Sequence, residues 1–270
     1  MRIVYLGSPD FAVPALDKLC AAGYAPLAVI TQPDRARNRG RTTPTPVKAR
    51  ALELGLPVYA PEKIKSGQAV RLLAGLAPDL LVVVAYGQLL SGEILSLPPL
   101  GAVNIHASLL PAYRGAAPIH WAIINGERES GVTTMYLDQG MDTGNMILSA
   151  KTGIGENETA GQLHDRLAGL GAELLLNTLA LIARGEAPSV PQPHEQASYA
   201  PPLKPEDERI DWQLSAEQTH NRIRGLNPWP GAYTLLAGKR LKLWRSLLVS
   251  PPLLAPAGRP VAEIVAAVHE

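Results

Sequence analysis

The sequence predicts an α/β protein in which a mostly parallel sheet carries helices on both faces and a small β-rich domain follows. Three observations predict this fold. Short apolar runs alternate with segments of helical spacing through residues 1–184. A proline-rich stretch without periodicity occupies residues 185–205, which is typical of an extended linker. The apolar runs in residues 206–270 are short and β-like, so we expect a separate carboxy-terminal domain there.

The amino-terminal part supplies most of the expected strands. Four apolar runs bounded by turn residues are typical of buried parallel strands: residues 2–7, 25–31, 78–87 and 101–108. After the first run, Ser8 and Pro9 are expected to begin a helix with apolar residues at helical spacing. Residues 47–55 and 68–77 are also expected to be helical. The Pro-, Arg- and Thr-rich residues 32–46 have no periodicity, so we expect a long surface loop.

The middle and the end of the chain continue this pattern. Residues 131–138 and 145–151 are expected strands. Thr159 and Gln162 have the spacing of a capping box at the start of a helix. That helix carries a stripe of leucines: Leu163, Leu167, Leu170, Leu174 and Leu181. Beyond the linker we expect two clear strands and a weaker third one, at residues 231–236, 239–249 and 260–268.

Composition places the chain among globular proteins. Hydrophobic residues make up 46% of its 270 residues, which argues against disorder. No run has the roughly 20 apolar residues that span a bilayer. The amino terminus has no signal-peptide pattern, so we expect a cytoplasmic protein without a membrane partner. Cys20 is the only cysteine and the six histidines lack metal-ligand spacing, so we expect no metal site.

Two phosphate-binding motifs are absent from the sequence, and one basic segment is present. The first expected strand is followed by a single glycine and then by Pro9 and Phe11, which does not fit the glycine-rich fingerprint of dinucleotide binding. The Walker pattern is also missing. The segment from Gln32 to Arg50 contains several basic residues but only one acidic residue, Asp34. A chain of net charge +1 can still hold a polyanion through such an arm.

Polar residues with catalytic potential follow two of the expected strands. Asn104 and His106 are two apart at a strand end, so both side chains leave the same face. An amide can donate to a developing oxyanion, and an imidazole can move a proton near neutral pH. Asp142 lies in a glycine-bracketed loop and can orient such an imidazole. Spacing alone leaves a second interpretation open, in which these residues form a hydrogen-bonded strand end and an ordinary turn.

Longer motifs around these residues resemble one family. The stretches NIHASLLPAYRGAAPIHWAIINGE (104–127) and GVTTMYLDQGMDTGN (131–145) resemble the catalytic core of the 10-formyltetrahydrofolate-dependent formyltransferases, which are Rossmann-like. Within that superfamily, four further motifs are most similar to the members that formylate methionyl-tRNA: TQPDR, VVVAYGQLL, RIDW and NRIRGLNPWPG. The resemblance covers nearly the whole chain.

The resemblance implies a reaction and a role for each central residue. A formyl group passes from N10 of 10-formyltetrahydrofolate to the α-amino group of initiator methionyl-tRNA through a tetrahedral intermediate. Asn104 and protonated His106 would hold the oxyanion, and Asp142 would position His106 and assist proton transfer. Neither a metal nor a covalent intermediate is required. The enzyme is expected to be a monomer.

The resemblance also implies two binding segments. The folate co-substrate would contact two short stretches: Ala85, Tyr86, Gly87, Gln88, Leu89, Leu90, Ser108, Leu109, Leu110 and Pro111. For the four leucines, plain core packing is the alternative. The tRNA acceptor stem would meet the basic arm: Arg35, Arg37, Arg39, Arg41 and Lys48. For this arm the alternative is a solvated loop. Arg114 either meets an anion or braces its loop, and Trp212 and Trp229 are expected to pack between the domains.

Three departures from the tRNA-enzyme pattern concern the acceptor. Ala112 stands where the family usually has Arg, and Pro202 where Lys is common. The family's carboxy-terminal domain is an OB-like barrel of about five strands, of which only three are expected here, so an incomplete barrel is predicted. We therefore expect weaker, more salt-sensitive tRNA binding. Two alternatives remain: a sugar-nucleotide N-formyltransferase, for which Ala112 is typical, and a folate-binding or folate-hydrolysing paralogue.

Overall fold

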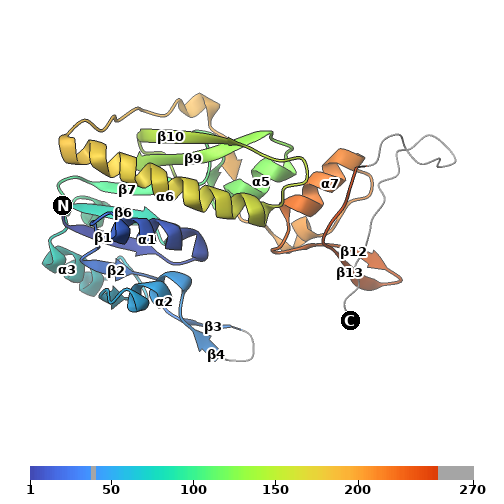
Figure 1. Ribbon diagram of the computed structural model, residues 1–270. Coiled ribbons are helices and arrows are strands. Elements are labelled where there is room, and N and C mark those ends of the chain that lie inside the picture. The colour runs from blue at the N-terminus through green and yellow to red at the C-terminus, as the bar shows by residue number, and fades with distance from the viewer. Residues whose placement is uncertain (38–40, 249–270) are drawn as a thin grey trace. The chain divides into compact units, whose positions relative to one another are not determined.

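A computed structural model describes residues 1–37 and 41–248 of the chain, with only the backbone described at 35–37 and 41–42 (Figure 1). The chain forms two compact units whose stretches alternate along the sequence. Unit 1 comprises Met1–Arg114, Gly131–Ala150 and Leu167–Ala197. Unit 2 comprises Gly115–Ser130, Lys151–Arg166 and the chain from Ser198 onward. The predicted site residues all lie in unit 1.

A seven-stranded, mostly parallel sheet forms the centre of unit 1. Its strands are β1 (Ile3–Gly7), β2 (Ala28–Ile30), β5 (Val58–Tyr59), β6 (Leu80–Val84), β7 (Ala102–His106), β9 (Glu129–Tyr136) and β10 (Met146–Gly153), in the order β10-β9-β7-β6-β1-β2-β5. The strands from β5 to β7 pair in parallel, whereas β9 runs antiparallel to β7. The α/β prediction with a mostly parallel sheet is therefore confirmed.

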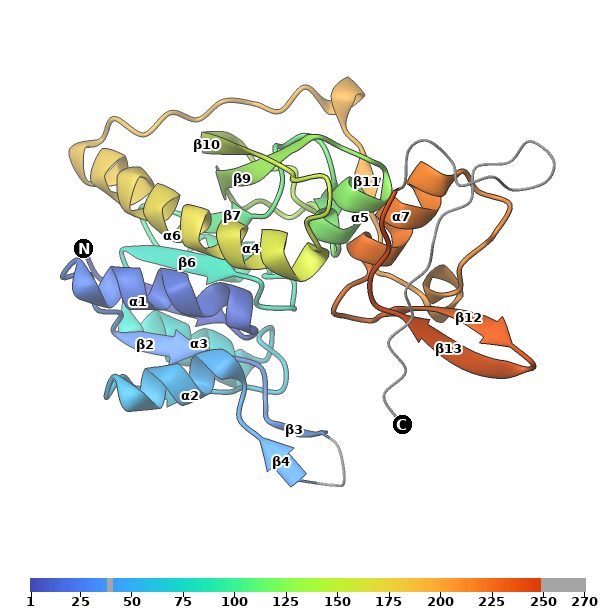
Figure 2. The ribbon, with the colours of Figure 1, turned by 45° about the vertical axis from the view of Figure 1, so that its right-hand side comes forward.

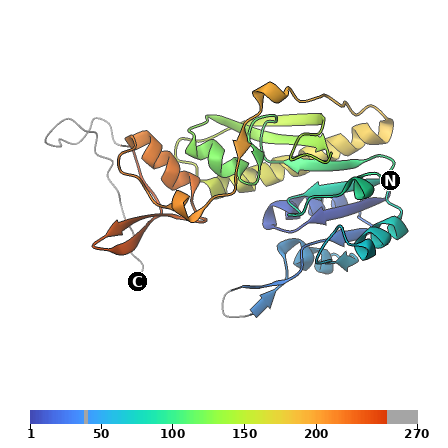
Figure 3. The ribbon, with the colours of Figure 1, turned by 180° about the vertical axis from the view of Figure 1, so that it is seen from behind.

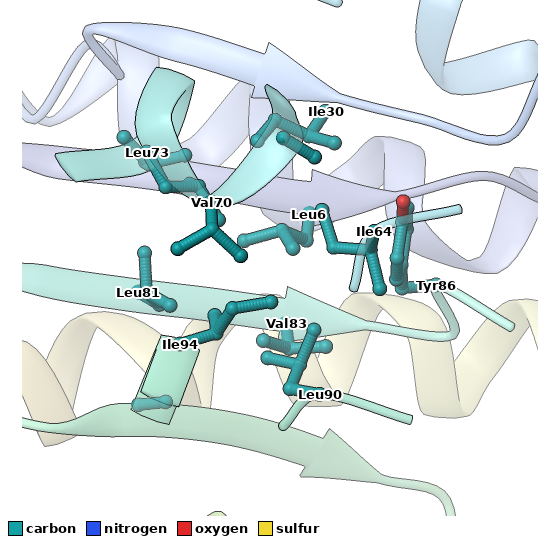
Figure 4. Packing of buried hydrophobic residues seen from close by; sticks show 13 residues of the cluster. Leu6, Ile30, Ile64, Val70, Leu73, Leu81, Val83, Tyr86, Leu90 and Ile94 are labelled. Atoms are coloured by element: carbon teal, nitrogen blue, oxygen red, sulfur yellow. The ribbon is translucent and has the colours of Figure 1, made fainter. Parts of the chain in front are cut away.

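Helices cover both faces of this sheet (Figures 1 and 3). One face carries α1 (Val13–Ala21), α2 (Pro46–Glu53) and the long helix α6 (Ala160–Arg184), and the other carries α3 (Gly67–Leu76) and α4 (Gly92–Leu95). Lys18 of α1 forms an ion pair with Glu173 of α6. Alternate strand residues such as Leu6 and Leu81 pack against α3 and α4 in a cluster of fully or nearly buried side chains (Figure 4).

Local hydrogen bonds explain where the helices begin. Gln162 accepts from the backbone N–H of Thr159 and Thr159 accepts from that of Gln162, so the predicted capping box is confirmed. The prediction for Ser8 is wrong. Its hydroxyl accepts from the N–H of Gln32 at 3.1 Å and donates to the carbonyl of Tyr86 at 3.2 Å. It thus joins neighbouring strand ends, and the first α-helix begins only at Val13, after a 3-10 turn.

Helix α6 is long and apolar enough to span a membrane by length and composition alone, although no such stretch was expected from the sequence. Half of its most apolar window is buried inside the protein. Leu163, Leu167 and Leu174 of the predicted stripe are among its buried residues. A core helix passes the same test, and the inward stripe is the pattern of a helix that packs on a sheet.

The basic segment is not the irregular loop that was expected. Residues Arg35–Arg37 form β3 and Arg41–Thr43 form β4, and the two strands pair as an antiparallel ribbon (Figure 2). Residues 38–40, including Arg39, lie outside the described residues. The sequence gives no alternation here because a two-stranded ribbon away from the core needs no apolar face. Its strands are joined through backbone hydrogen bonds.

The proline-rich stretch is extended, as predicted, but it is fixed to the sheet. Val190 and Met146 exchange backbone hydrogen bonds of 2.8 and 2.9 Å at the edge strand β10. Two residues further on, the Gln192 side chain is only 3% exposed. A short 3-10 turn, His194–Gln196, follows. This part of the stretch therefore belongs to the body of unit 1.

Unit 2 contains two of the three expected strands and a helix that was not predicted. Strands β12 (Ala232–Leu236) and β13 (Lys239–Leu243) form a hairpin whose turn residues, Ala237 and Gly238, both have positive φ. Helix α7 (Ala216–Gly225) begins at a Ser215–Gln218 capping box and packs against α5 (Pro118–Ile124). The third predicted strand, 260–268, lies outside the described residues.

The two tryptophans of unit 2 lie outside the hydrophobic core of their own unit. Trp212 is 49% exposed and Trp229 is 69% exposed. The small core of this unit instead consists of aliphatic side chains: Ile210, Ile223, Leu226, Ala232 and Leu243. The indole of Trp212 donates to the Thr234 hydroxyl at 2.8 Å, which satisfies its polar atom while the ring stays accessible.

Candidate active site

Strand β7 places Asn104 and His106 on one face of the sheet, as the sequence predicted. Asn104 is 9% exposed and His106 is 6% exposed. The residue between them, Ile105, faces α6 so closely that a Cβ on Gly171 would stand 2.8 Å from its Cγ2. Because side chains alternate along a strand, Asn104 and His106 point to the face opposite α6. There they meet loop residues that follow β7 and β9.

The imidazole of His106 has two different neighbours. Its Nε2 lies 2.9 Å from the carbonyl oxygen of Tyr113. A carbonyl can only accept, so we assign the hydrogen to Nε2 from this contact. Its Nδ1 lies 3.6 Å from Oδ2 of Asp142. The carboxylate therefore faces the ring nitrogen opposite the one that contacts Tyr113.

Reaching His106 requires an unusual path for the loop that carries Asp142. The register pairs His106 with Thr133 and Val103 with Tyr136, so β9 passes His106 and ends three residues beyond it, about 10 Å away along the strand. The loop of residues 137–145 must fold back over the face of the sheet. Asp142 adopts a positive φ of 54°, and a side chain at Gly144 would overlap the Tyr136 carbonyl. The glycine-bracketed pattern is explained by this fold-back.

The tip of the same loop is held together by Asp138. Its carboxylate accepts from the backbone N–H of Gly140 at 2.9 Å and from the hydroxyl of Thr143 at 2.7 Å. These contacts link residues on both sides of Asp142 without using its carboxylate. Asp138 thus shapes the loop locally, and other groups must set the position of the loop on the sheet.

The first segment expected to hold folate follows β6. Ala85 and Gly87 both have positive φ, which turns the chain sharply at the strand end. Gln88 is half-buried and donates to the Gln32 side chain at 3.2 Å and to the Glu62 carbonyl at 3.1 Å. Leu89 is 59% exposed, whereas Leu90 lies in the hydrophobic cluster shown in Figure 4, so core packing describes Leu90 in this structure.

Tyr86 also lies in that cluster, and its hydroxyl is unusual. The ring is 2% exposed, and the hydroxyl oxygen has no hydrogen-bond partner among the described residues. Burial raises the pKa of this phenol to about 12. The side chain is therefore neutral at physiological pH and acts as a large apolar group with one unsatisfied polar atom.

The second expected folate segment is fixed to β9. The Ser108 hydroxyl donates to the Ala112 carbonyl at 2.6 Å, which closes the turn around Leu109, Leu110 and Pro111. Thr133 donates its hydroxyl to the Ser108 carbonyl at 2.7 Å and accepts from the Leu110 N–H at 3.2 Å. Leu110 is 7% exposed, and its neighbours Leu109 and Pro111 are half-buried. The segment is thus held in one conformation beside His106.

Arg114 braces the site from within. Its side chain is 2% exposed, and Nε and Nη2 donate to Oε1 of Gln192 at 3.0 and 2.6 Å. Nη2 also lies 3.2 Å from Nδ1 of His194. The bracing interpretation of Arg114 is therefore the one the contacts fit. Gln192 was missed because it is one glutamine in an aperiodic stretch, and nothing in the sequence marks it.

The basic arm is described only in part. Arg35, Arg37 and Arg41 are placed by their backbone in β3 and β4, and Arg39 lies outside the described residues. Lys48 is at the start of α2, where its ammonium lies 2.5 Å from Oδ2 of Asp34. The charge of Lys48 thus pairs with Asp34, the residue directly before β3, and holds this end of the ribbon. Among the described residues, no group of three or more His, Cys, Asp or Glu side chains forms a metal site.

Comparison of the sequence with known proteins identifies close relatives. It matches the family described as Formyl transferase over residues 1–179 and the Formyl transferase C-terminal domain over residues 202–266. Methionyl-tRNA formyltransferase of Pelotomaculum thermopropionicum is 56% identical, over 92% of this chain and 80% of that protein. The enzyme of the same name from Moorella thermoacetica is 55% identical, over 97% of this chain and 84% of its own length.

Solved structures share the fold at lower identity. The N-formyltransferase from Helicobacter canadensis, in complex with folinic acid and dTDP-3-aminofucose, has a TM-score of 0.74 and 20% identity and covers 98% of both chains. A sugar 3N-formyl transferase, solved with dTDP and 5-N-formyl-THF, has a TM-score of 0.71 and 21% identity over 93% of this chain and 88% of that one. From the family match and the identities to its relatives, this chain belongs to the formyl transferase family.

Proposed function

We propose that this chain transfers the formyl group of 10-formyltetrahydrofolate to the α-amino group of initiator methionyl-tRNA. The observation that carries the proposal is the approach of Asp142 to Nδ1 of His106, on the sheet face that also carries Asn104. The relatives named methionyl-tRNA formyltransferase, more than half identical over most of the chain, support this acceptor over an amino sugar. Structures of relatives with folinic acid or 5-N-formyl-THF support a folate donor.

The chemistry divides among three side chains. The neutral amine of the acceptor attacks the formyl carbon, which forms the new C–N bond and a tetrahedral oxyanion. The Asn104 amide and the protonated Nδ1 of His106 stabilise this charge, and one such donor is worth about 3 kcal/mol of barrier. Collapse breaks the bond to N10, whose electron pair is neutralised by the proton lost from the attacking amine. Asp142 stabilises the imidazolium and relays that proton, so formyl-methionyl-tRNA and tetrahydrofolate leave.

The binding segments complete this proposal. The backbone turn at Ala85–Gly87 and the fixed turn at 108–111 supply donors, acceptors and apolar walls for the pterin. Arg35, Arg37, Arg39 and Arg41 contact the tRNA backbone, and Lys48 orients the ribbon through Asp34. The division into residues 1–184, 185–205 and 206–270, a cytoplasmic location and a monomeric state are part of the same proposal. The domain division and the location are supported by the sequence patterns.

A formyl-transfer assay tests the acceptor. Purified protein with 10-formyltetrahydrofolate is offered methionyl-tRNA or a panel of nucleotide-linked amino sugars, each at 50 and 200 mM salt. We expect methionyl-tRNA to be formylated and its KM to rise steeply with salt, because phosphate contacts release counterions. Formylation of an amino sugar instead, which Ala112 would favour, contradicts the proposal. Release of formate without any acceptor would show a hydrolase.

A further inference from the structure

The side chain of Gln192 makes hydrogen bonds in two directions. Its Oε1 accepts from Nε and Nη2 of Arg114 at 3.0 and 2.6 Å. Its Nε2 donates to the carbonyl of Asp142 at 2.8 Å and to that of Gly144 at 2.7 Å. A guanidinium has donors only and a carbonyl accepts only, so the amide can have just one orientation. Both donors and both lone pairs of the buried amide are therefore used.

The loop that carries Asp142 needs such a tether. The hydrogen bonds of Asp138 hold the loop to itself, and the antiparallel strand β9 passes His106 and ends opposite Val103, so the loop must return along the sheet. Gln192 bonds the carbonyls of Asp142 and Gly144, and it comes from a segment that is itself fixed to β10 through Val190. It thus connects the backbone that bears the carboxylate to the body of unit 1.

Resting on the function proposed above, we propose that Gln192 is a positioning residue for the reaction. It holds the Asp142 carboxylate at Nδ1 of His106, and buried Arg114 fixes the amide in the orientation that this requires. Arg114 has no carboxylate in salt-bridge range among the described residues, so its hydrogen bonds are available to Gln192 and His194. Gln192 touches neither reactant and acts only through the loop.

Replacing Gln192 by Glu separates its hydrogen bonds to Arg114 from its hydrogen bonds to the Asp142 loop. In Gln192→Glu the carboxylate still accepts from Arg114, and the buried pair gains charge complementarity. Its second oxygen faces the carbonyl oxygens of Asp142 and Gly144, where it has no hydrogen to donate and repels both. The substitution therefore keeps the brace on Arg114 and releases the loop. A matched control is Gln162→Glu, since glutamate serves equally well in the capping box of α6.

The test compares kcat and KM of the full-length variants. We expect Gln192→Glu to lower kcat about 10- to 100-fold, in keeping with the cost of a misplacement of about 1 Å, with KM for both substrates within about twofold of the wild type. Gln162→Glu should match the wild type. In the Asp142→Asn background, Gln192→Glu should add no further loss, since its effect passes through the same carboxylate. A full additional loss in that background, or an unchanged kcat, overturns the proposal.

Folding of the variant is checked by thermal melting. If Gln192→Glu does not fold, Gln192→Met, of equal length and without charge, takes its place with the same expectation, and failure of both to fold would make Gln192 a purely structural residue. The acceptor assay remains a separate question. If the wild type formylates only an amino sugar or only releases formate, the proposed function fails, and the same comparison is run on that reaction. If methionyl-tRNA is formylated but kcat is insensitive to Gln192, only this inference fails.

Discussion

Oδ2 of Asp142 lies 3.6 Å from Nδ1 of His106, while the opposite nitrogen of the same ring lies 2.9 Å from the carbonyl oxygen of Tyr113. The imidazole is thus held between a fixed acceptor and a carboxylate, and only Nδ1 is left for proton exchange. In the proposed mechanism this arrangement makes the charge of Asp142, and not its size, the property that matters.

Replacing Asp142 by Asn tests that implication. The amide keeps the shape of the carboxylate but no longer stabilises an imidazolium, so we expect kcat to fall by about 10²- to 10⁴-fold. The affinity for folate, measured by fluorescence titration, should change little. A kcat within a factor of three of the wild type would remove Asp142 from the proton path.

Asn104→Ala tests the oxyanion contact. Loss of one preorganised donor should reduce kcat by about 10²- to 10³-fold, with folate binding retained. Asn177→Ala is the matched control, because Asn177 lies in the same unit and is exposed on α6. Equal losses in the two variants would indicate a general effect on the fold and argue against an oxyanion donor at position 104.

Neutralising the basic arm should act on tRNA binding alone. Each Arg→Ala change at positions 35, 37, 39 or 41 that removes a phosphate contact should raise KM for methionyl-tRNA. It should also reduce the salt slope of binding by about one unit. Arg184→Ala, at the end of α6 and paired with exposed Glu186, is the control. The comparison requires tRNA titrations at several salt concentrations, and an unchanged slope in all four variants would exclude the arm from the interface.

Tyr86→Phe tests the unpaired hydroxyl in the core of unit 1. Removing a buried polar atom that has no partner should leave the free energy of unfolding unchanged or raise it by about 1 kcal/mol. Tyr5→Phe is the contrasting variant, since the hydroxyl of Tyr5 donates to the Ala12 carbonyl and its loss should destabilise the fold by about 1 kcal/mol. Urea denaturation measures both, and a destabilised Tyr86→Phe would show that the hydroxyl has a partner.

Glu158 should make the free energy of unfolding of unit 2 depend on pH in the acidic range. Burial raises the pKa of its carboxyl, but hydrogen bonds from Arg166 and from the Gly155 N–H outweigh burial and leave the pKa below the ordinary value of 4.5. Because the folded pKa is depressed, the stabilisation is present above that ordinary value and is lost as pH falls through the folded one.

The variant Glu158→Gln tests this sign. At pH 7 it should lose about 1.5–3 kcal/mol of unfolding free energy, the typical value of hydrogen bonds to a charged group, and the difference from the wild type should shrink below about pH 4.5. Glu186→Gln, in an exposed pair with Arg184, should cost less than about 0.5 kcal/mol at either pH. A difference for Glu158→Gln that grows in acid would contradict the assignment.

Periodicity and turn chemistry predicted the sheet well because they reflect burial along a strand. Residues 101–108 became β7, and the Thr159–Gln162 box begins α6. Ser8 failed because its hydroxyl serves a tertiary contact that no local pattern encodes. Helix α7 was overlooked because its sequence, AEQTHNRIRG, contains one large apolar residue, although its capping box was readable.

Some residues of the candidate site were easier to predict from the sequence than others. Asn104 and His106 follow from the period of a strand, and Asp142 from its glycine-bracketed loop and the resemblance, although nothing local indicates that this loop folds back along the sheet. Gln192 could not be predicted at all. Its importance comes from being buried between Arg114 and the Asp142 loop, and burial of a single polar residue in an aperiodic stretch leaves no trace in the sequence.

Because stretches of the two units alternate along the chain, the carboxy-terminal part cannot be removed without affecting earlier segments. The chain enters unit 2 at Gly115, again at Lys151 and finally at Ser198. Helix α5 in the first of these stretches packs against α7 in the last, and residues such as Ile119 and Ile123 are buried. A nonsense mutation near residue 198 would therefore remove the helix that packs against α5. It would leave α5 with an uncovered apolar face, and gene fusions that exchange the carboxy-terminal part must supply a helix to cover it.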